Sequence, residues 1–280
     1  MNPESNPSIP DALVQSLSPC RSAAALTGAG ISSESGVPTF RDAQTGLWAK
    51  YAPTELATPE AFESNPRRVW EWYAWRRQLV TQVQPNAGHV ALNQILQGFA
   101  RHQLLTQNVD GLHQKAGASS VIELHGNLHR TLCSRERTPV LEVDPQASPP
   151  VCPDCGSPLR PDVVWFGESP PADALHLAVE SAQSCDVFFS IGTSGTVYPA
   201  AELPFTAKRN GALVIEVNRE PTPITEVADA VRAWMLELPS GTVRSRGGNI
   251  SIRTMGVEER ADAIGDIVVR ALPDGQSIRV

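Results

Sequence analysis

Short apolar runs alternate with longer amphipathic segments along the chain. The short runs are apolar almost throughout, which is typical of strands buried on both faces of a parallel sheet, and the longer segments have helical spacing. This alternation predicts an α/β fold, a Rossmann-like doubly wound parallel sheet. We expect strands at 23–27, 103–106, 121–124, 163–166, 187–191 and 212–217, and helices at 65–83, 87–100, 172–184, 199–208 and 258–271.

Two segments interrupt this alternation and predict a smaller inserted lobe. Residues 48–84 are helical in pattern and carry four of the six tryptophans, and residues 129–160 carry three cysteines among many prolines. The Gly/Ser/Arg-rich stretch 240–249 predicts a flexible loop. We expect a single domain over 1–280, with a large Rossmann-type lobe at about 10–47, 85–128 and 161–280 and a small lobe (helical segment plus zinc module) at about 48–84 and 129–160.

Composition and charge exclude several classes of protein. Apolar residues make up 41% and charged residues 19% of the 280 residues, a globular balance that excludes disordered and fibrous classes. No run approaches the ~20 apolar residues that a membrane span needs, so we expect no membrane partner. The first residues resemble neither a signal nor a transit peptide, which favours a cytoplasmic location. A net charge of −7 disfavours sequence-independent binding of nucleic acid.

A glycine-rich segment, Gly28-Ala29-Gly30-Ile31-Ser32, follows the first expected strand. Glycines at such a position let backbone amides approach a pyrophosphate without interference from a Cβ atom. From Gly28 to Ser33 the pattern is G-x-G-x-x-S rather than the full G-x-G-x-x-G fingerprint of dinucleotide-binding sites. Taken alone, it is equally consistent with an ordinary glycine turn.

Further motifs follow in a fixed order: GAGISSESGVPTFRDAQTGLW at 28–48, TQNVDGLH at 106–113, ELHG at 123–126, VVWFGE at 163–168, GTSGTVYPA at 192–200 and VNREPTP at 217–223. In this order and spacing, from about 26 to 229, the chain resembles the sirtuins, NAD-dependent protein-lysine deacylases. The resemblance implies that the acyl oxygen of an acyl-lysine attacks the ribose C1′ of NAD. The products would be free lysine, nicotinamide and an O-acyl-ADP-ribose.

His125 in ELHG matches the catalytic histidine of the family, a base that takes a proton from a ribose hydroxyl. An imidazole with a pKa near 6.5 suits that role, although a histidine after a strand is more often a packed or capped residue. The resemblance places Gln107, Asn108 and Asp110 at the nicotinamide pocket, where the residues alone also fit a simple turn. The implied NAD-binding set is Gly28, Ala29, Gly30, Thr39, Phe40, Arg41, Trp48, Gln107, Asn108, Asp110, Gly192, Thr193, Ser194, Asn218 and Glu220.

One face of the helix expected at 65–83 carries Val69, Tyr73, Arg76 and Val80 at helical spacing. A guanidinium in an apolar stripe is costly unless paired, so Arg76 either extends to solvent, bridges to a carboxylate of the chain, or binds a carboxylate of the substrate. The Y-x-x-R pattern resembles class III, desuccinylase-type sirtuins, and Ala57 matches a small residue that makes room for a longer acyl chain. The resemblance also implies that the substrate peptide pairs with Val164, Trp165, Phe166, Gly167 and Glu168.

The expected metal site departs from the family pattern. Sirtuins hold a structural zinc with two C-x-x-C pairs; here Cys152-Pro-Asp-Cys155 is intact, but the first pair reads Cys133-Ser-Arg-Glu136. Three thiolates and the Glu136 carboxylate are able to bind Zn²⁺, less tightly than four thiolates. The alternative is a lost site with three remaining cysteines. Cys20 and Cys185 adjoin apolar runs, and we expect both to be buried and inert.

The combined prediction is an NAD-dependent deacylase that removes succinyl, malonyl and also acetyl groups from lysine in proteins or peptides. NAD would be a consumed co-substrate and Zn²⁺ a structural ion. Two alternatives remain: a non-catalytic module that binds NAD or acyl-lysine, and an ordinary NAD oxidoreductase. Residues 231–249 depart from the family pattern, so the sequence assigns no site residue beyond Ala230.

Overall fold

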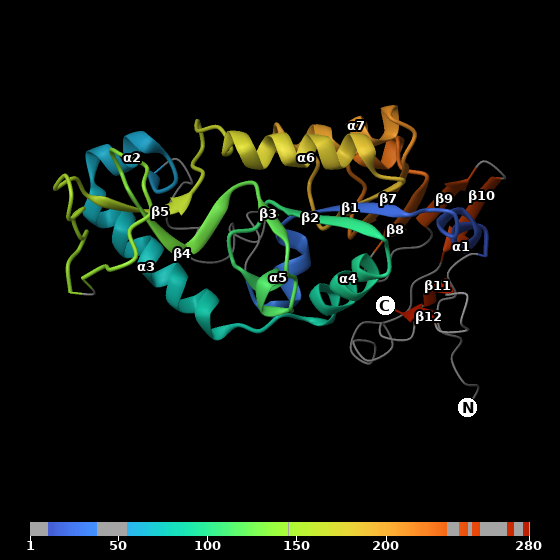
Figure 1. Cartoon of the computed structure of the whole chain (residues 1–280), viewed down its shortest axis with the longest axis horizontal. Helices are drawn as coiled ribbons and strands as arrows, with labels where there is room; N and C mark the ends of the chain where they lie inside the picture. Colours follow the sequence, from blue (N-terminus) through green and yellow to red (C-terminus); the bar gives the residue numbers. More distant parts are fainter. Residues whose placement is uncertain are drawn as a thin grey trace.

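A six-stranded parallel sheet forms the centre of the chain (Figure 1). The structure is a computed structural model that describes residues 11–37, 55–144, 146–233, 241–245, 248–252, 268–271 and 277–279. The strand order is β3-β2-β1-β6-β7-β8, so the chain winds outward from β1 in both directions and the order reverses between β1 and β6. The strands are β1 (Ser22–Thr27), β2 (Arg101–Thr106), β3 (Val121–Glu123), β6 (Val187–Ile191), β7 (Leu213–Asn218) and β8 (Ala230–Ala233).

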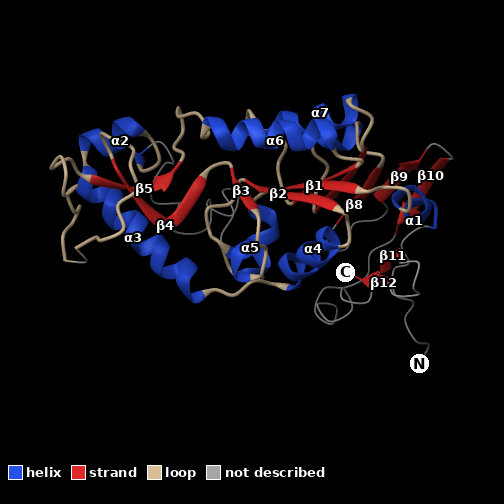
Figure 2. Cartoon of the chain, in the orientation of Figure 1, coloured by secondary structure: helices blue, strands red, loops and turns tan. Residues whose placement is uncertain are grey.

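Helices cover both faces of this sheet (Figure 2), which confirms the predicted doubly wound α/β class. Alternate residues of β1 face opposite sides: Ala25 packs with one helical layer and Ala24 with the other. The small alanine side chains let both layers lie close to the central strand. One layer consists of α1 (Asp11–Leu17), η1 (Ala29–Ser35) and α4 (Ala87–Gln97), and the other of α6 (Ala172–Ser184) and α7 (Leu203–Arg209).

A second group of elements lies beyond the β3 edge of the sheet (Figure 1). Here β4 (Gly126–Cys133) and β5 (Leu159–Val163) form an antiparallel pair packed against α2 (Pro59–Ser64) and α3 (Pro66–Gln82). Asn65 caps α3 by accepting a hydrogen bond from the Arg68 amide. These elements carry much of the predicted smaller lobe, whose exact boundaries stay a prediction.

The remaining described elements are short. None of the helices in the described ranges is long and apolar enough to cross a membrane. The remaining short elements are α5 (Leu112–Lys115), η5 (Ala200–Glu202), η6 (Pro223–Glu226), β9 (Gly241–Ser245), β10 (Gly248–Ile252), β11 (Val268–Ala271) and β12 (Ser277–Arg279).

Five of the six predicted strands are present with ends within two residues of those predicted. The strand predicted at 163–166 is wrong: β5 ends at Val163 and the chain then turns. The Glu168 amide closes that turn on the Trp165 carbonyl at 3.0 Å, and Gly167 has a φ of +88°. A turn that needs this backbone conformation ends the ladder despite the apolar sequence before it.

Two predictions near the C-terminus are also wrong where the structure describes them. The loop predicted at 240–249 contains β9 and the first residues of β10, and these two strands pair antiparallel. The helix predicted at 258–271 is contradicted at 268–271, where β11 pairs with β12, and its residues 258–267 lie outside the described residues. Val268 and Val269 are β-branched, and such residues favour strands once a partner strand is present.

Candidate functional site

The carboxyl ends of β1 and β6 meet where the strand order reverses, the usual ligand position in an open α/β sheet. The Gly30 amide donates to the Gly192 carbonyl at 2.8 Å, and the Gly28 amide donates to the Ile191 carbonyl at 3.0 Å. A Cβ atom would lie 2.7 Å from Thr193 Cα at position 28, and 2.7 Å from the Gly192 oxygen at position 30. Only glycine fits at either position, so the predicted NAD segments at 28–30 and 192–194 are packed directly against each other.

The end of β7 completes this edge. The Asn218 side chain donates to the Thr193 carbonyl at 2.7 Å, and the Ser194 and Thr196 hydroxyls lie 2.8 Å apart. Glu220 is exposed just beyond the strand. The structure therefore brings the predicted residues of β1, β6 and β7 to one end of the sheet.

The predicted nicotinamide-pocket residues lie next to this edge, after β2. The Asn108 side-chain amide donates to the Ser32 hydroxyl at 3.1 Å, and that hydroxyl donates to the Asp110 carboxylate at 2.7 Å. The Gln107 oxygen accepts from the Thr193 hydroxyl at 2.9 Å. Within the described residues, Gln107 Nε2 is buried without a hydrogen-bond partner, so it offers a donor to a bound polar ligand.

Two members of this cluster were missed at the sequence level. Ser32 lies inside the glycine-rich segment. His89, which belongs to α4, has its Nε2 atom 3.3 Å from the Ser32 hydroxyl. Ser32 was readable as part of the motif, whereas His89 lies 57 residues away in the sequence and was indicated by no local pattern.

His125 lies in the turn between β3 and β4, and its hydrogen bond shows which ring nitrogen carries the proton. Its Nδ1 lies 3.1 Å from the Gln107 carbonyl oxygen. Because a carbonyl oxygen only accepts, Nδ1 carries the proton and the Nε2 lone pair is left to act as a base. Burial lowers the pKa of His125 while the Gln107 contact opposes that shift, so the imidazole is neutral near pH 7.

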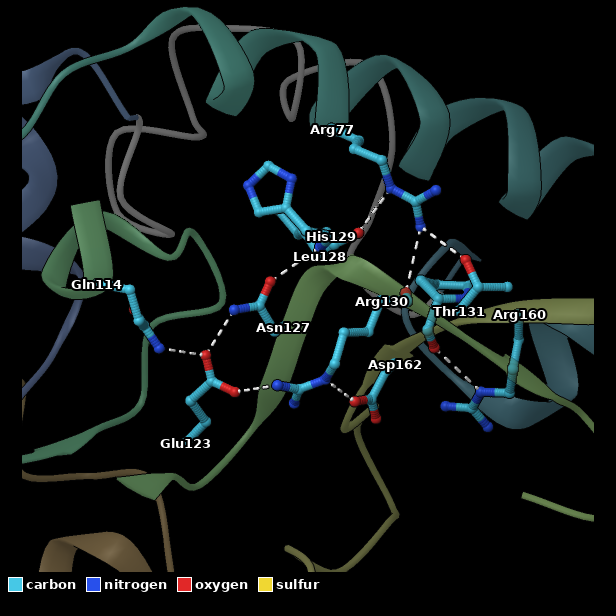
Figure 3. A network of polar contacts seen from close by, with 11 residues as sticks. Arg77, Gln114, Glu123, Asn127, Leu128, His129, Arg130, Thr131, Arg160 and Asp162 are labelled. Carbon is cyan, nitrogen blue, oxygen red and sulfur yellow. Dashed lines mark hydrogen bonds and ion pairs between the residues drawn. The ribbon is translucent and has the colours of Figure 1, made fainter. Parts of the chain in front are cut away.

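A network of charges holds the turn that carries this histidine (Figure 3). The partly buried Glu123 carboxylate accepts from Gln114 at 2.8 Å, from Asn127 at 2.5 Å and from Arg130 at 2.5 Å. Arg130 also donates to Asp162 of β5 at 2.6 Å. Glu123 and Asn127 flank the histidine, so their bond restricts the turn from both sides. The sequence prediction did not include this network.

The predicted acyl-binding residues belong to one apolar cluster between α3 and the segment after β5. Ala57, Val69, Tyr73 and Val80 are all buried there. The Arg76 guanidinium carbon lies 4.9 Å from the Trp72 ring centroid and 5.6 Å from that of Tyr73. Burial lowers the pKa of Arg76, and its interactions with Tyr73 and Asp110 oppose that shift.

Most backbone amides of the segment predicted to bind the substrate peptide, 164–168, already donate hydrogen bonds to other groups of the chain. The amides of Val164 and Phe166 donate to His125 and Ala57 carbonyls, both at 2.9 Å. The Trp165 amide donates to the Glu168 carboxylate at 2.9 Å. A substrate peptide lying along this segment would therefore pair mainly with its carbonyl oxygens.

The three cysteines expected to bind metal lie together, with sulfur atoms all within 4.8 Å of one another. Cys133 and Cys155 Sγ are 3.4 Å apart, close to the spacing of thiolates that share one tetrahedral zinc. Hydrogen bonds from Ser157 lower the pKa of the Cys155 thiol to about 7, which favours the thiolate that a metal requires. The residues present therefore fit a zinc ion.

The two halves of this module share one backbone geometry. Arg137 and Gly156 each follow the C-x-x-X segment with a positive φ, 59° and 71°, and each amide returns to the carbonyl of the first cysteine. Glu136 thus has the backbone position that Cys155 has in the other half, and its amide donates to Cys133 Sγ at 3.4 Å. Its carboxylate, however, pairs with Arg135 at 3.1 Å instead of joining the cysteines.

Other predicted positions have simpler outcomes. Cys20 and Cys185 are buried as expected, at 6% and 9% exposed. Four residues of the predicted NAD set, Thr39, Phe40, Arg41 and Trp48, lie outside the described residues.

Comparisons with known proteins agree with this geometry. Residues 28–199 match the family model described as the Sir2 family. An NAD-dependent protein deacylase of Aquifex aeolicus (strain VF5) is 58% identical over 211 residues, which cover 73% of this chain and 86% of that protein. One from Mycobacterium tuberculosis (strain ATCC 25177 / H37Ra) is 49% identical over 209 residues, covering 72% and 87%.

Solved structures agree as well. A Sir2 homolog in complex with NAD has a TM-score of 0.74 and 42% identity, covering 82% of this chain and 90% of that one. A Sir2 complex with a p53 peptide and NAD has a TM-score of 0.69 and 33% identity, covering 80% and 90%.

The buried His113 predicts a measurable loss of stability in mild acid. Burial, and then the nearby His89, lower its pKa to about 3; its Nε2 contacts the Thr27 hydroxyl at 2.9 Å, and its Nδ1 has no partner among the described residues. Below pH 6.5 this histidine therefore binds a proton in the unfolded chain but not in the folded chain. The free energy of unfolding then falls as the pH decreases, by up to about 1.4 kcal/mol per pH unit. Urea denaturation at pH 7.5 and 5.5 measures this slope.

The free energy of unfolding should fall less between pH 7.5 and 5.5 in His113→Gln than in the wild type, by roughly 1 kcal/mol. This difference does not depend on how the substitution changes stability at pH 7.5. His176→Gln on the exposed surface of α6 is the control, and its slope should equal that of the wild type. Equal slopes in the wild type and His113→Gln would contradict the assignment.

Proposed function

The chain belongs to the Sir2 family, and we propose that it is an NAD-dependent protein-lysine deacylase that prefers succinyl and malonyl groups to acetyl. One observation carries the acyl preference. A guanidinium and a phenol, Arg76 and Tyr73, lie side by side in an apolar cluster that also contains the small Ala57. A carboxylate at the end of an acyl chain is a ligand that accepts hydrogen bonds from both groups.

NAD would lie along the carboxyl ends of β1, β6 and β7. The glycine amides at 28–30 and the segment 192–194 suit the pyrophosphate, and Asn218 and Glu220 suit the adenosine ribose. Gln107, Asn108 and Asp110 would orient the nicotinamide and its ribose by hydrogen bonds. The Gln107 side-chain Nε2, which has no hydrogen-bond partner among the residues that the structure describes, is a donor for that purpose.

In the proposed reaction, the acyl oxygen of the substrate attacks C1′ as the bond to nicotinamide breaks. Nε2 of neutral His125 then accepts a proton from a ribose hydroxyl, whose oxygen attacks the imidate formed in the first step. Water completes the release of lysine and of the O-acyl-ADP-ribose. Only the second step uses the base, so the two steps are separable by experiment.

A structural zinc would be held by Cys133, Cys152 and Cys155, with Glu136 as the fourth ligand after it leaves Arg135. The ion would supply cross-linking of the β4–β5 end and no chemistry. Support comes from the sulfur spacing and from the matching backbone of the two halves.

His125→Ala should slow deacylation at least about 100-fold, because it removes the base of the second step. Exchange of labelled nicotinamide into NAD, which reports the first step, should fall far less. His129→Ala, an exposed neighbour on β4, is the control and should leave both rates near those of the wild type. Deacylation near the wild-type rate in His125→Ala would refute the role of this residue.

Wild-type protein should process succinyl and malonyl peptides roughly 10- to 150-fold better than acetyl peptides in kcat/KM, mainly through KM. This range corresponds to about 1.5–3 kcal/mol for a charge-assisted hydrogen bond. Arg76→Met should bring the ratio toward one.

Arg77→Met is the matched control for the Arg76 variant. The adjacent Arg77 donates to the Leu128 carbonyl at 2.6 Å, so its loss should leave the ratio unchanged. Equal rates on all acyl peptides in the wild type would show that Arg76 is structural.

Protein purified without added metal should contain about one zinc per chain, because a single site has these ligands. Cys152→Ser should lose the metal and melt at a lower temperature, whereas Cys185→Ser should keep the metal. Glu136→Gln should weaken zinc in competition with a chelator if the carboxylate is a ligand. Folded, active, zinc-free wild-type protein would refute the site.

A further inference from the structure

Trp165, in the turn after β5, makes a polar contact that its predicted role in peptide binding does not explain. Its indole Nε1 donates to the Tyr73 hydroxyl oxygen at 3.0 Å. The two side chains are 3% and 4% exposed, so the bond is shielded from water. They lie 92 residues apart in the sequence and meet where α3 packs against β5 (Figure 1).

This contact restricts what the Tyr73 hydroxyl is able to do. An indole N–H and a guanidinium are donors only. The Tyr73 oxygen accepts from the Trp165 indole, and the Arg76 guanidinium carbon lies 5.6 Å from the centroid of the same tyrosine ring. An oxygen that accepts from such neighbours directs its own proton away from them. The hydroxyl is thereby set as a donor, and accepting a bond also strengthens the bond that it donates.

Neighbouring groups hold both the indole ring and the backbone of Trp165 in place. The Arg160 guanidinium carbon lies 3.4 Å from its ring centroid, and the Phe62 ring lies at 5.2 Å. Its backbone amide donates to Glu168, whose two carboxylate oxygens accept from Arg160 at 2.7 and 2.8 Å. Arg160 is 4% exposed, so this pair is itself largely buried. The direction of the indole N–H is therefore fixed before any substrate binds.

We propose that Trp165 is a specificity-determining positioning residue: its indole N–H orients the Tyr73 hydroxyl as a donor toward the carboxylate of an acidic acyl group. The inference rests on the proposed function, because it needs the acyl carboxylate to bind at Tyr73 and Arg76. An acetyl group ends in a methyl, which gains nothing from an oriented donor. The effect is therefore on the choice among acyl groups and not on the chemical step.

Trp165→Phe tests this directly, since it keeps an aromatic ring against Arg160 and Phe62 and removes the N–H. The succinyl-to-acetyl ratio of kcat/KM should fall about 3- to 10-fold, the worth of one neutral hydrogen bond, through the KM of the succinyl peptide. Genetic incorporation of 3-benzothienylalanine at position 165, with sulfur in place of the N–H, preserves the ring size and should give the same fall. This second variant keeps the test valid if the phenylalanine variant folds poorly.

A double-mutant cycle separates orientation from packing. In a Tyr73→Phe background there is no hydroxyl to orient, so Trp165→Phe should not reduce the ratio further. If Trp165 had only a structural role, its substitution would lower kcat/KM equally for succinyl and acetyl peptides, and it would do so in both backgrounds. Trp70→Phe is the matched control, because this buried tryptophan of α3 also lies beneath an arginine, Arg77 at 5.6 Å, but packs in the cysteine cluster.

The outcomes distinguish this inference from the function on which it rests. A wild type without an acidic-acyl preference overturns both. A clear wild-type preference that Trp165→Phe and the benzothienylalanine variant retain overturns only the role of Trp165. An equal fall in the Trp70→Phe control would also overturn it.

Discussion

The turn from Glu123 to Asn127 joins the parallel sheet to the β4–β5 pair, and the arrangement of the candidate site depends on it. The Leu124 amide is bonded to Thr106 of β2, His125 Nδ1 to Gln107, and the His125 carbonyl to the Val164 amide. Gly126 has a φ of +79°, and a Cβ there would lie 2.1 Å from the Asp162 oxygen. The chain therefore passes from one set of elements to the other through a single permitted conformation, and His125 stands at that point.

The acyl cluster follows the general energetics of buried charge. A guanidinium removed from water destabilises the fold unless other groups satisfy it. Arg160 and Glu168 solve the same problem within the chain, with two short parallel bonds. The buried Arg160 is thus satisfied by the fold. Arg76 is only partly buried and lies against the rings of Trp72 and Tyr73, and it is the arginine that we propose binds the carboxylate of the substrate.

The cysteine module has the same backbone geometry in its two halves, although only one half ends in a second cysteine. The segment from Cys133 to Arg137, with Glu136 in the place of a second cysteine, has the same turn and the same positive φ as its counterpart from Cys152 to Gly156. A non-glycine residue at a φ of 59° is uncommon and is kept only when its surroundings impose it. The Arg137 guanidinium reaches Glu168 at 3.3 Å, so the module also supports the turn that holds Trp165.

Sequence alone determined the elements whose periodicity is strong and the residues that belong to contiguous motifs. Strands such as 187–191 and the helix at 172–184 were predicted at their observed bounds, because buried strands and amphipathic helices leave a local pattern. Tertiary structure alone decided the end of β5 at Val163, the strand at 268–271, the pairing of Glu136 with Arg135, and the contact of Trp165 with Tyr73. Only the contact of Trp165 with Tyr73 joins residues far apart in the sequence. The other three depend on a turn at 165–168, on the partner strand at 277–279 and on the charge of a neighbouring residue. Hydrogen bonds and ion pairs of these kinds leave no periodic pattern in the residues that make them.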